Sequence, residues 1–233
     1  MPRFSLYGGR DPRTLPAYGL AEAARYLHIP PATLRSWLVG RTYPRQDGVG
    51  SFEPLIKPTG KGVLRLSFVN LVEAHVLRAL RTQHGIPISH VRQALDYAER
   101  ELGIQRLLLS AELLTSAGEL FLEQYGQLIN LSRSGQLAIK KVLEAHLRRV
   151  ERDDRALPIR LYPFLSTGEE DGRRPVVIDP CVSFGRPMLA GAGVTTAAIA
   201  QRIDAGESVA DLALDYGITP GQVEEAVVFE NAA

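Results

Sequence analysis

The stretch LAEAARYLHIPPATL, residues 20–34, decides the fold, and it recurs without a gap as VADLALDYGITPGQV, residues 209–223. Each copy has apolar residues at helical spacing, a short turn and a proline at the start of the next helix, Pro31 in the first copy and Pro220 in the second. This pattern is typical of two short helices joined by a tight turn. The sequence therefore predicts a helix-turn-helix hairpin near each end of the chain.

The first hairpin has the pattern of an element that binds DNA. Its second helix, ATLRSWLVG, runs to Gly40 and places Leu34, Trp37 and Leu38 on one face, which we expect in the core. The opposite face carries Ala32, Thr33, Arg35 and Ser36. Those are the positions that a recognition helix presents to a DNA groove. A helical hairpin with a solvated charged face explains the same pattern.

Two apolar runs punctuated by glycine follow this hairpin. Residues 55–56 and 63–66 predict a β-hairpin, and Lys57 and Lys61 lie at its tip. Such a hairpin would be a basic wing. Ser67 then begins a predicted helix, and a further turn and helix follow it.

Helix-turn-helix, wing and helix, in this order over residues 15–100, resemble the DNA-binding domain of the MerR family of transcriptional regulators. The motifs ATLRSWL and LSFVNLVEAHVLRALR carry the resemblance. It implies that a homodimer binds DNA through Thr33, Arg35, Ser36, Arg41, Tyr43, Lys57, Lys61 and Arg65. Trp37 is better explained as a core residue, and Arg65 also fits an outward strand residue without a DNA contact.

The net charge of +1 conceals a strong segregation of charge along the chain. Residues 1–81 carry 12 Lys and Arg against 5 Asp and Glu, whereas residues 169–233 carry 4 against 11. A positive field attracts phosphate and a negative field repels it. We therefore expect different partners at the two ends.

Composition indicates a soluble globular protein of about two domains, since the chain has 233 residues of which 45% are hydrophobic. No apolar run approaches the ~20 residues needed to cross a bilayer. Residues 1–9 lack the apolar core of a signal peptide, so we expect a cytoplasmic protein. The single cysteine, Cys181, excludes an internal disulfide and a multi-cysteine zinc site.

The middle of the chain, residues 101–165, has a less regular pattern and is a candidate dimerisation segment. Residues 105–132 alternate short apolar runs with polar residues and predict small strands, with SAGE as a turn. Residues 135–154 predict an amphipathic helix, which either packs on this segment or contacts a second copy or the DNA backbone. Pro158 and Pro163 restrict the strand that follows to an edge position.

The polar segment at residues 166–174 is the predicted linker to a C-terminal domain at residues 175–233. A short strand at residues 176–178 precedes a helix capped by Thr195 or Thr196, and the second hairpin follows. The last helix, TPGQVEEAVVFE, carries glutamates and no basic residue, so a phosphate backbone would repel it. We expect that the second hairpin does not bind DNA.

This C-terminal segment resembles a small domain of VapB-type antitoxins, long classified as of unknown function, which pairs with PIN-like ribonuclease toxins. The Gly-Arg-Pro turn, the pair Gly191 and Gly193, and the AGES turn carry the resemblance. It implies a toxin-binding surface with the candidates Arg186, Pro187, Met188, Leu189, Val194, Val227, Val228 and Phe229. Arg186 could pair with the carboxylates of a toxin's metal site, or it could brace its own turn against Asp179.

No motif indicates an enzyme. The stretch GAGVTT, residues 191–196, lacks the Gly-Lys-Ser/Thr ending of a phosphate loop, and the histidines lack the spacing of metal ligands. The acidic residues near the C-terminus are spread along predicted helices instead of converging from strand ends. We therefore predict no catalytic residue, no metal site and no cofactor.

The sequence thus predicts a mainly helical protein with small β elements. It divides into a MerR-like winged helix-turn-helix domain at residues 1–100, a middle α+β segment, and a C-terminal strand-and-three-helix domain that contains the second hairpin. The predicted function is that of an antitoxin that neutralises a PIN-like toxin and represses its own operon by binding operator DNA. The alternative is a MerR-like regulator that senses a small ligand.

Overall fold

The structure is a computed structural model of the 233-residue chain. It describes residues 7–45, 48–58, 64–81, 88–110, 113, 116–128, 133–165 and 172–231. The chain folds into two compact units, each of which combines segments distant in the sequence. The first unit comprises residues 1–35, 58–68 and 159–233, and the second comprises residues 36–57 and 69–158. The domain boundaries given above stay predictions of how the chain divides into independently folding parts.

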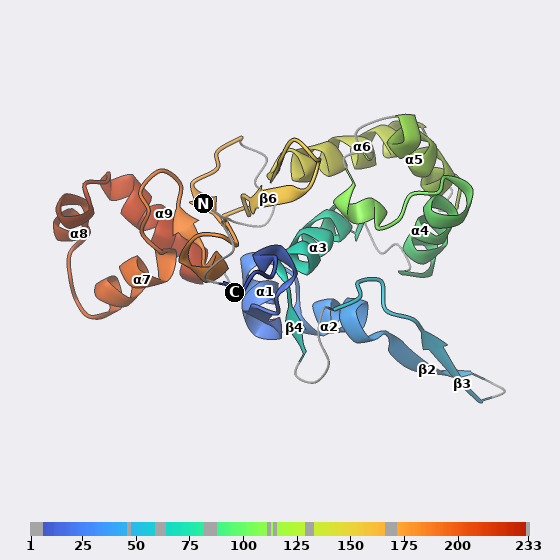
Figure 1. The fold of residues 1–233 in the computed structure, drawn as a ribbon, viewed down its shortest axis with the longest axis horizontal. Coiled ribbons are helices and arrows are strands. Elements are labelled where there is room, and N and C mark those ends of the chain that lie inside the picture. The colour runs from blue at the N-terminus through green and yellow to red at the C-terminus, as the bar shows by residue number, and fades with distance from the viewer. Residues whose placement is uncertain are drawn as a thin grey trace. The chain divides into compact units, whose positions relative to one another are not determined.

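Helices dominate the described part of the chain, and short strands pair in two-stranded sheets (Figure 1). The first unit contains β1 (Tyr18–Gly19), α1 (Leu20–Tyr26), β4 (Arg65–Leu66), β7 (Val176–Val177), β8 (Met188–Leu189), α7 (Thr196–Asp204), α8 (Val209–Tyr216) and α9 (Pro220–Asn231). The second contains β2 (Arg41–Arg45), β3 (Gly48–Phe52), α4 (Ile88–Glu101), α5 (Ser116–Leu128), α6 (Arg133–Leu147) and β5 (Val150–Arg152). The elements α2 (Pro31–Val39), α3 (Phe68–Arg81) and β6 (Pro158–Leu161) include residues of both units. The predicted mainly helical class with small β elements is confirmed.

The first predicted hairpin is formed by α1 and α2. The Glu22 carboxylate accepts a hydrogen bond from the Gly19 amide at 3.1 Å and thereby caps the start of α1. Ala23 and Ala24 on this helix are buried. The helix α2 begins at Pro31, because a proline at the first helical position has no amide hydrogen to leave unpaired.

The second predicted hairpin is formed by α8 and α9, and α7 completes the C-terminal group of helices. Thr195 caps α7 and Ser208 caps α8, since each hydroxyl accepts a hydrogen bond from an amide in the first turn. Gly217 ends α8 in the left-handed conformation, at φ +62°. The three helices and β8 share one buried apolar core, made of Leu189, Ile199, Leu212, Ala213, Val223 and Ala226. The predicted hairpin and the predicted cap, at Thr195 of the two threonines considered, are confirmed.

The core of the second unit is built around α3, whose residues are buried along most of its length. Its Leu80 carbonyl accepts a hydrogen bond from the Tyr125 hydroxyl of α5 at 2.8 Å. The Tyr125 ring also stacks on Phe121 one turn earlier, with ring centroids 6.0 Å apart. The helix α4 confirms the one predicted after α3, and α6 confirms the helix predicted in residues 135–154 as far as Leu147, whereas Val150–Arg152 of that range form β5.

The predicted β-hairpin of residues 55–56 and 63–66 is wrong. The amides of residues 55–56 instead donate hydrogen bonds to the Trp37 carbonyl, at 2.9 and 3.0 Å. Residues 65–66 form β4, which pairs with β1. The backbone groups that this hairpin needed are therefore engaged by other partners, and Lys61 lies outside the described residues. A hairpin does follow α2 directly, but it is formed by β2 and β3.

The small strands predicted for residues 105–132 are also wrong, because the described part of this segment is helical. A short 3-10 helix spans Leu107–Leu109, and the SAGE sequence opens α5 instead of forming a turn. Phe121, Leu122 and Tyr125 are buried at helical spacing. The alternation of apolar and polar runs thus reflects one buried helix face.

Candidate nucleic-acid interface and the C-terminal domain

The helix α2 presents the predicted recognition face at its surface. Leu34, Trp37 and Leu38 are buried, and Trp37 is only 2% exposed, which confirms that it is a core residue. On the remaining surface of the helix, Arg35 is exposed, and Thr33 and Ser36 are half-buried. One cation and two hydroxyl groups therefore occupy the side of α2 that does not pack into the core.

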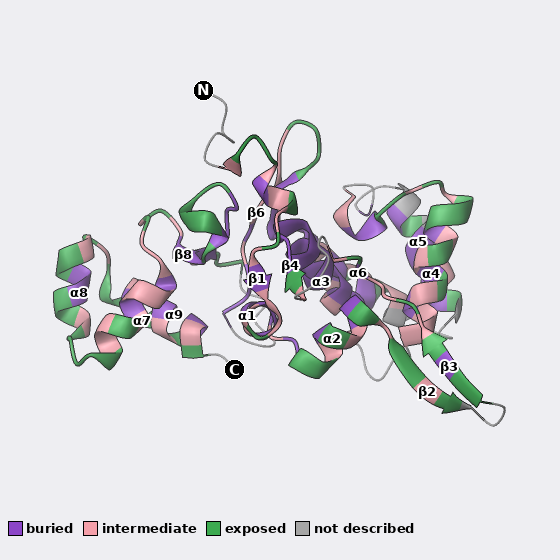
Figure 2. Cartoon of the chain, turned by 60° about the horizontal axis from the view of Figure 1, so that its bottom comes forward, coloured by how far each residue is buried: buried purple, intermediate pink, exposed green. Residues whose placement is uncertain are grey.

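The strands β2 and β3 form an exposed hairpin directly after α2. Figure 2 shows most of the hairpin in the colour of exposed residues. Gly40, between α2 and β2, has a φ of +75°, and a Cβ there would lie 2.0 Å from the Phe52 carbonyl oxygen. Only glycine permits this close passage from helix to strand. Arg41 follows at once, exposed and opposite Phe52 in the strand register.

Tyr43 packs within this hairpin. Its ring stacks on Phe52, with centroids 4.6 Å apart and an interplanar angle of 23°. Gly50 lies opposite Tyr43, and a Cβ at that position would approach the Tyr43 ring to 2.6 Å. The half-buried tyrosine therefore shapes the hairpin, and its ring is held by two neighbours of the opposite strand.

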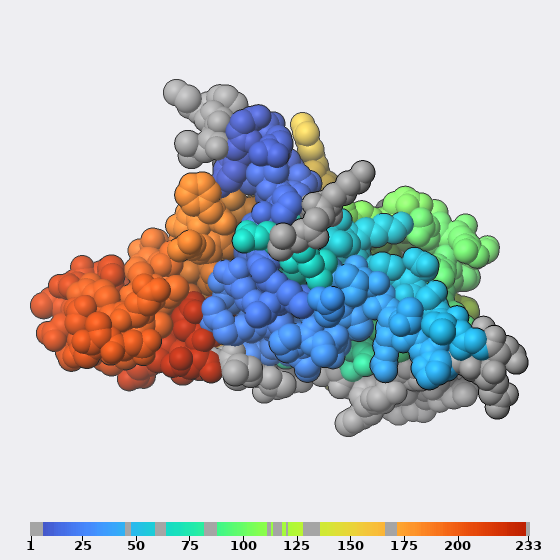
Figure 3. Space-filling view, turned by 90° about the horizontal axis from the view of Figure 1, so that it is seen from below, coloured from blue at the N-terminus to red at the C-terminus, as the bar shows by residue number. Residues whose placement is uncertain are grey.

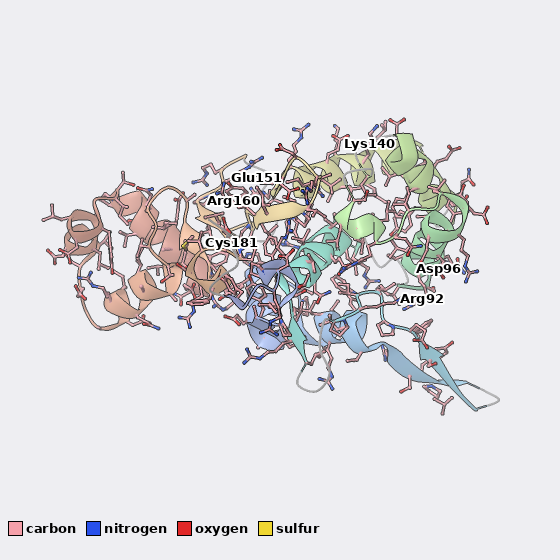
Figure 4. All side chains as sticks on the ribbon, viewed as in Figure 1. Arg92, Asp96, Lys140, Glu151, Arg160 and Cys181 are labelled. Carbon is pink, nitrogen blue, oxygen red and sulfur yellow. The ribbon has the colours of Figure 1, made fainter. Side chains whose placement is uncertain are left out.

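Three further cations are relevant to DNA binding, two in the second unit and one in the first. Lys57 is exposed, and its backbone carbonyl accepts a hydrogen bond from the Asn70 amide group at 3.0 Å. Arg65 is exposed on β4 of the first unit. Arg92, on α4, was missed by the sequence analysis: its guanidinium lies 5.9 Å from the Phe52 ring centroid, within the range of a cation–π contact. Figure 4 labels Arg92 on its helix. No pattern in the sequence connects α4 with β3.

Most residues predicted to contact a toxin belong to the interior of the C-terminal domain. Those that are buried are Pro187, Met188, Leu189 and Phe229. Val194 and Val227 are partly buried against the shared core. Val228 is 50% exposed, and Arg186 is exposed. In this conformation the apolar candidates hold the domain together, so Val228 and Arg186 are the ones that reach solvent.

The turn that contains Arg186 is braced by another arginine. The Asp179 carboxylate accepts hydrogen bonds from Arg160 Nε at 3.0 Å and from the Cys181 amide at 2.9 Å. Figure 4 labels Arg160 and Cys181 in this part of the first unit. The alternative in which Arg186 braces the turn against Asp179 therefore does not describe the structure.

The helices α9 and α1 pack against each other in the first unit. The Glu230 carboxylate accepts hydrogen bonds from the Arg25 guanidinium at 2.7 Å and from the Thr196 hydroxyl at 2.5 Å. The Phe229 ring stacks on Tyr26, with centroids 5.7 Å apart. In Figure 3 the blue surface of the N-terminal helix adjoins the red surface of the last helix. No pattern in the sequence indicates this contact.

The last helix of the second hairpin is acidic, in contrast to the first hairpin, which carries Arg25 and Arg35. Glu224 is exposed, Glu225 pairs with Arg173 at 3.2 Å, and the sequence of α9 contains no Lys or Arg. A phosphate backbone would meet repulsion at this surface. The inability of the second hairpin to bind DNA stays a prediction.

Within the described ranges, no three His, Cys, Asp or Glu side chains are grouped so that they could hold a metal ion. The helices in those ranges also include none that combines the length and the apolar character needed to cross a membrane.

The two hairpin regions match known sequence families. Residues 16–95 match the family described as "Putative DNA-binding HTH domain", and residues 176–229 match "Protein of unknown function (DUF433)". The fold and these matches define the class: a helix-turn-helix protein with a C-terminal DUF433 region.

The chain is 34% identical to "Putative antitoxin VapB45" of Mycobacterium tuberculosis (strain ATCC 25618 / H37Rv), over 91% of this chain and 93% of that protein. It therefore belongs to the VapB45 family. It is also 26% identical to "Uncharacterized protein Rv2308" of the same organism, over 90% of this chain and 88% of that protein. The crystal structure of Rv2018 from Mycobacterium tuberculosis is similar to this fold, with a TM-score of 0.64 and 27% identity, covering 91% of this chain and 98% of that one.

Proposed function

We propose that this chain is the antitoxin of a type II toxin-antitoxin system and that it binds and neutralises a PIN-like ribonuclease toxin. The observation that carries the proposal is the similarity to VapB45 over 91% of this chain and 93% of that protein. An antitoxin is a binding protein, so this relative agrees with the prediction that the chain is not an enzyme. The acidic C-terminal region supports a protein partner there, because its charge disfavours nucleic acid.

We also propose that the chain represses its own operon by binding operator DNA as a homodimer, through a MerR-like winged helix-turn-helix. In this proposal α2 enters the major groove with Thr33, Arg35 and Ser36 toward the bases. The hairpin of β2 and β3 is the wing, and Arg41 contacts a phosphate. Further phosphate contacts come from Lys57, Lys61 and Arg65, while Tyr43 supports the wing. The match to a DNA-binding helix-turn-helix family over residues 16–95 supports this assignment.

The test of the toxin assignment uses the full chain and the purified product of the reading frame that adjoins its gene. We expect the two proteins to co-elute as one complex in size-exclusion chromatography, and we expect ribonuclease activity of the neighbour to fall to background when the chain is in excess. A neighbour that cuts RNA at an unchanged rate in saturating antitoxin would contradict the assignment.

The test of repression uses a reporter driven by the operon's own promoter. We expect the full chain to lower reporter output and to protect a symmetric operator in a footprint, because a two-fold dimer binds two half-sites. Sedimentation of the free chain as a monomer at every concentration that protects the operator would contradict the homodimer.

A regulator that senses a small ligand is the second candidate, and one feature of the second unit favours it. A hollow of about 460 Å³ lies between α5 and α6, and it is lined by Glu119, Leu122, Glu123, Gln127, Gln136, Leu137 and Lys140. Volumes of this size suit small molecules. A metabolite that raises the melting temperature of the chain and changes its operator affinity, with no effect of the neighbouring protein on either, would favour this candidate.

A further inference from the structure

A short segment of the C-terminal region exposes apolar side chains next to a cation. We call residues 181–186 the exposed tip. Phe184 is 72% exposed and Val182 is 43% exposed, although both are large apolar residues. Cys181 and Arg186 in the same segment are exposed as well. Exposed aromatic residues that lie beside an arginine are typical of protein-binding surfaces.

The backbone of the exposed tip sets the position of Phe184, whose exposed ring contacts the Tyr7 ring edge-on, with centroids 6.1 Å apart. Ser183 and Phe184 have φ values of +47° and +54°, in the left-handed region that residues with a Cβ rarely adopt, and Gly185 follows at +76°. Hydrogen bonds keep this conformation closed: the Gly185 amide donates to the Val182 carbonyl at 2.9 Å, and the Arg186 amide donates to the Ser183 carbonyl at 3.1 Å. Strained backbone conformations of this kind persist only where the surrounding structure stabilises them, and they occur preferentially at binding sites and active sites.

The base of the exposed tip is buried and tightly fitted. A Cβ at Gly185 would lie 2.3 Å from the Tyr18 hydroxyl, so the tip sits directly on the buried Tyr18 side chain. The Tyr7 hydroxyl donates to the Pro180 carbonyl at 2.9 Å, and Asp179 accepts from the Cys181 amide. The tip is therefore fixed before any partner arrives, which lowers the entropy lost on binding.

The electrostatics of the region leave one cation available at the exposed tip. Residues 175–233 contain two basic residues, Arg202 and Arg186. The Arg202 guanidinium is neutralised by the carboxylates of Glu207 and Asp215, to which it donates hydrogen bonds. Among the described residues, Arg186 forms no ion pair. An exposed guanidinium beside an apolar tip is complementary to an apolar pocket that carries carboxylates at its edge.

We propose that the exposed tip is the primary contact of this chain with its toxin, and that Phe184 and Val182 enter an apolar pocket whose rim carboxylates pair with Arg186. This inference rests on the proposed antitoxin function and names the part of the C-terminal region that performs it. It differs from the surface expected from the sequence, since neither Phe184 nor Val182 was among the predicted toxin contacts.

The position of the chain's one cysteine inside the exposed tip allows a footprint without any substitution. We expect alkylation of Cys181 by iodoacetamide to slow by at least about tenfold when the full chain is saturated with the purified product of the adjoining reading frame, because the thiol needs access to react. A complex in which Cys181 reacts as fast as in the free chain overturns the inference but leaves the antitoxin function intact. Absence of any complex overturns the antitoxin function, and the inference with it.

A matched pair of substitutions locates the contact. Phe184→Asn removes the aromatic ring, and asparagine tolerates the left-handed backbone of this position. We expect it to weaken toxin binding by at least about thirtyfold, the effect of a dominant interface residue. The control Leu214→Asn changes a residue that is 83% exposed on α8, and we expect its binding constant to equal that of the wild type.

Two results would overturn the assignment. The first is Phe184→Asn binding like the wild type, and the second is Leu214→Asn carrying the larger loss. Protection of Cys181 that grows with the concentration of the chain alone would identify a second copy of the chain as the occupant of the tip, and it would likewise overturn the toxin assignment.

Discussion

Glu230, in the last turn of the last helix, forms hydrogen bonds and an ion pair with Arg25 in the first helix of the helix-turn-helix. The Arg25 guanidinium donates to the Glu230 carboxylate at 2.7 Å and to the Glu230 backbone carbonyl at 2.9 Å. The same carboxylate accepts from the buried Thr196 hydroxyl at the start of α7. The Glu230 carboxylate thus connects α1, α7 and α9. The stability of the DUF433 region therefore depends on its contact with the first helix of the helix-turn-helix, and the reverse also holds.

We predict that Glu230→Ala lowers the free energy of unfolding by about 2 kcal/mol, because it leaves two donors in a mostly buried place without their acceptor. Urea unfolding followed by circular dichroism measures the change. The matched control is Lys140→Ala, which removes an exposed pair with Glu119 at 2.8 Å and should leave the urea midpoint unchanged. Equal midpoints for Glu230→Ala and the wild type would refute the joint role of this carboxylate.

Phe229 makes the apolar part of the same contact. It is 1% exposed and stacks on Tyr26, so Phe229→Ala should cost about 3–5 kcal/mol of unfolding free energy, the usual cost of removing a buried aromatic ring. The neighbouring Val228→Ala is the control, since Val228 is half exposed, and we expect a change below about 1 kcal/mol. The readout that identifies the contact is the near-ultraviolet circular dichroism of the tyrosines. If Val228→Ala costs as much as Phe229→Ala, the packing described for α9 is incorrect.

Acid should destabilise the second unit through two buried histidines. His75 and His146 lie with ring centroids 4.8 Å apart, and His75 Nε2 is 3.0 Å from the His146 carbonyl oxygen. Burial lowers the pKa of His146 to about 4 and the pKa of His75 well below 6.5, and the cations Arg78 and Arg149 add to both effects. In the folded protein both rings therefore stay neutral at a pH where the unfolded chain binds protons.

Above about pH 7 both histidines are neutral in the folded and the unfolded chain, so they cost no unfolding free energy. As the pH falls below the histidine pKa of the unfolded chain, the unfolded chain binds protons that the folded chain does not, and the free energy of unfolding decreases. At about pH 5 we expect a loss of roughly 2 kcal/mol from His146, and a further loss in the same direction from His75. Urea midpoints measured between these two pH values test this, and the double variant His75→Gln and His146→Gln should lose most of the dependence. A wild-type midpoint that is flat over this range would contradict the buried neutral state.

The sequence predicted the two helical hairpins because their signals are local. The proline at the start of each second helix, the serine and threonine caps, and Gly217 each act within one turn of the chain. The wing was misplaced for a local reason too: the glycines at residues 60 and 62 predicted a turn there, whereas the observed hairpin pairs β2 with β3, and β3 begins at the glycine of the Asp47-Gly48 dipeptide, a strong hairpin signal in the sequence.

The contacts that organise the first unit could not be predicted, because they join residues distant in the chain. Arg25 and Glu230 are 205 positions apart, and nothing in either neighbourhood indicates the other. The solvent exposure of individual apolar side chains could not be predicted from the sequence either. Met188 and Phe229 were expected at a toxin interface for their apolar character and are buried, while Phe184 is exposed through a left-handed backbone that no spacing pattern shows.

The DNA contacts proposed for α2 and the wing should respond differently to substitution. Arg35 lies exposed on α2, so Arg35→Ala should cost about 1–3 kcal/mol for the operator and little for a scrambled sequence, which removes sequence preference. Arg41 is exposed on the hairpin proposed as the wing, so Arg41→Ala should weaken both sequences alike and reduce the slope of log K against log salt by about 1. Gel shifts over a salt series with both DNAs measure the two effects, and Lys140→Ala, a cation on α6, is the control. Retention of full operator preference by Arg35→Ala, together with a wild-type salt slope for Arg41→Ala, would show that DNA binds elsewhere on the chain.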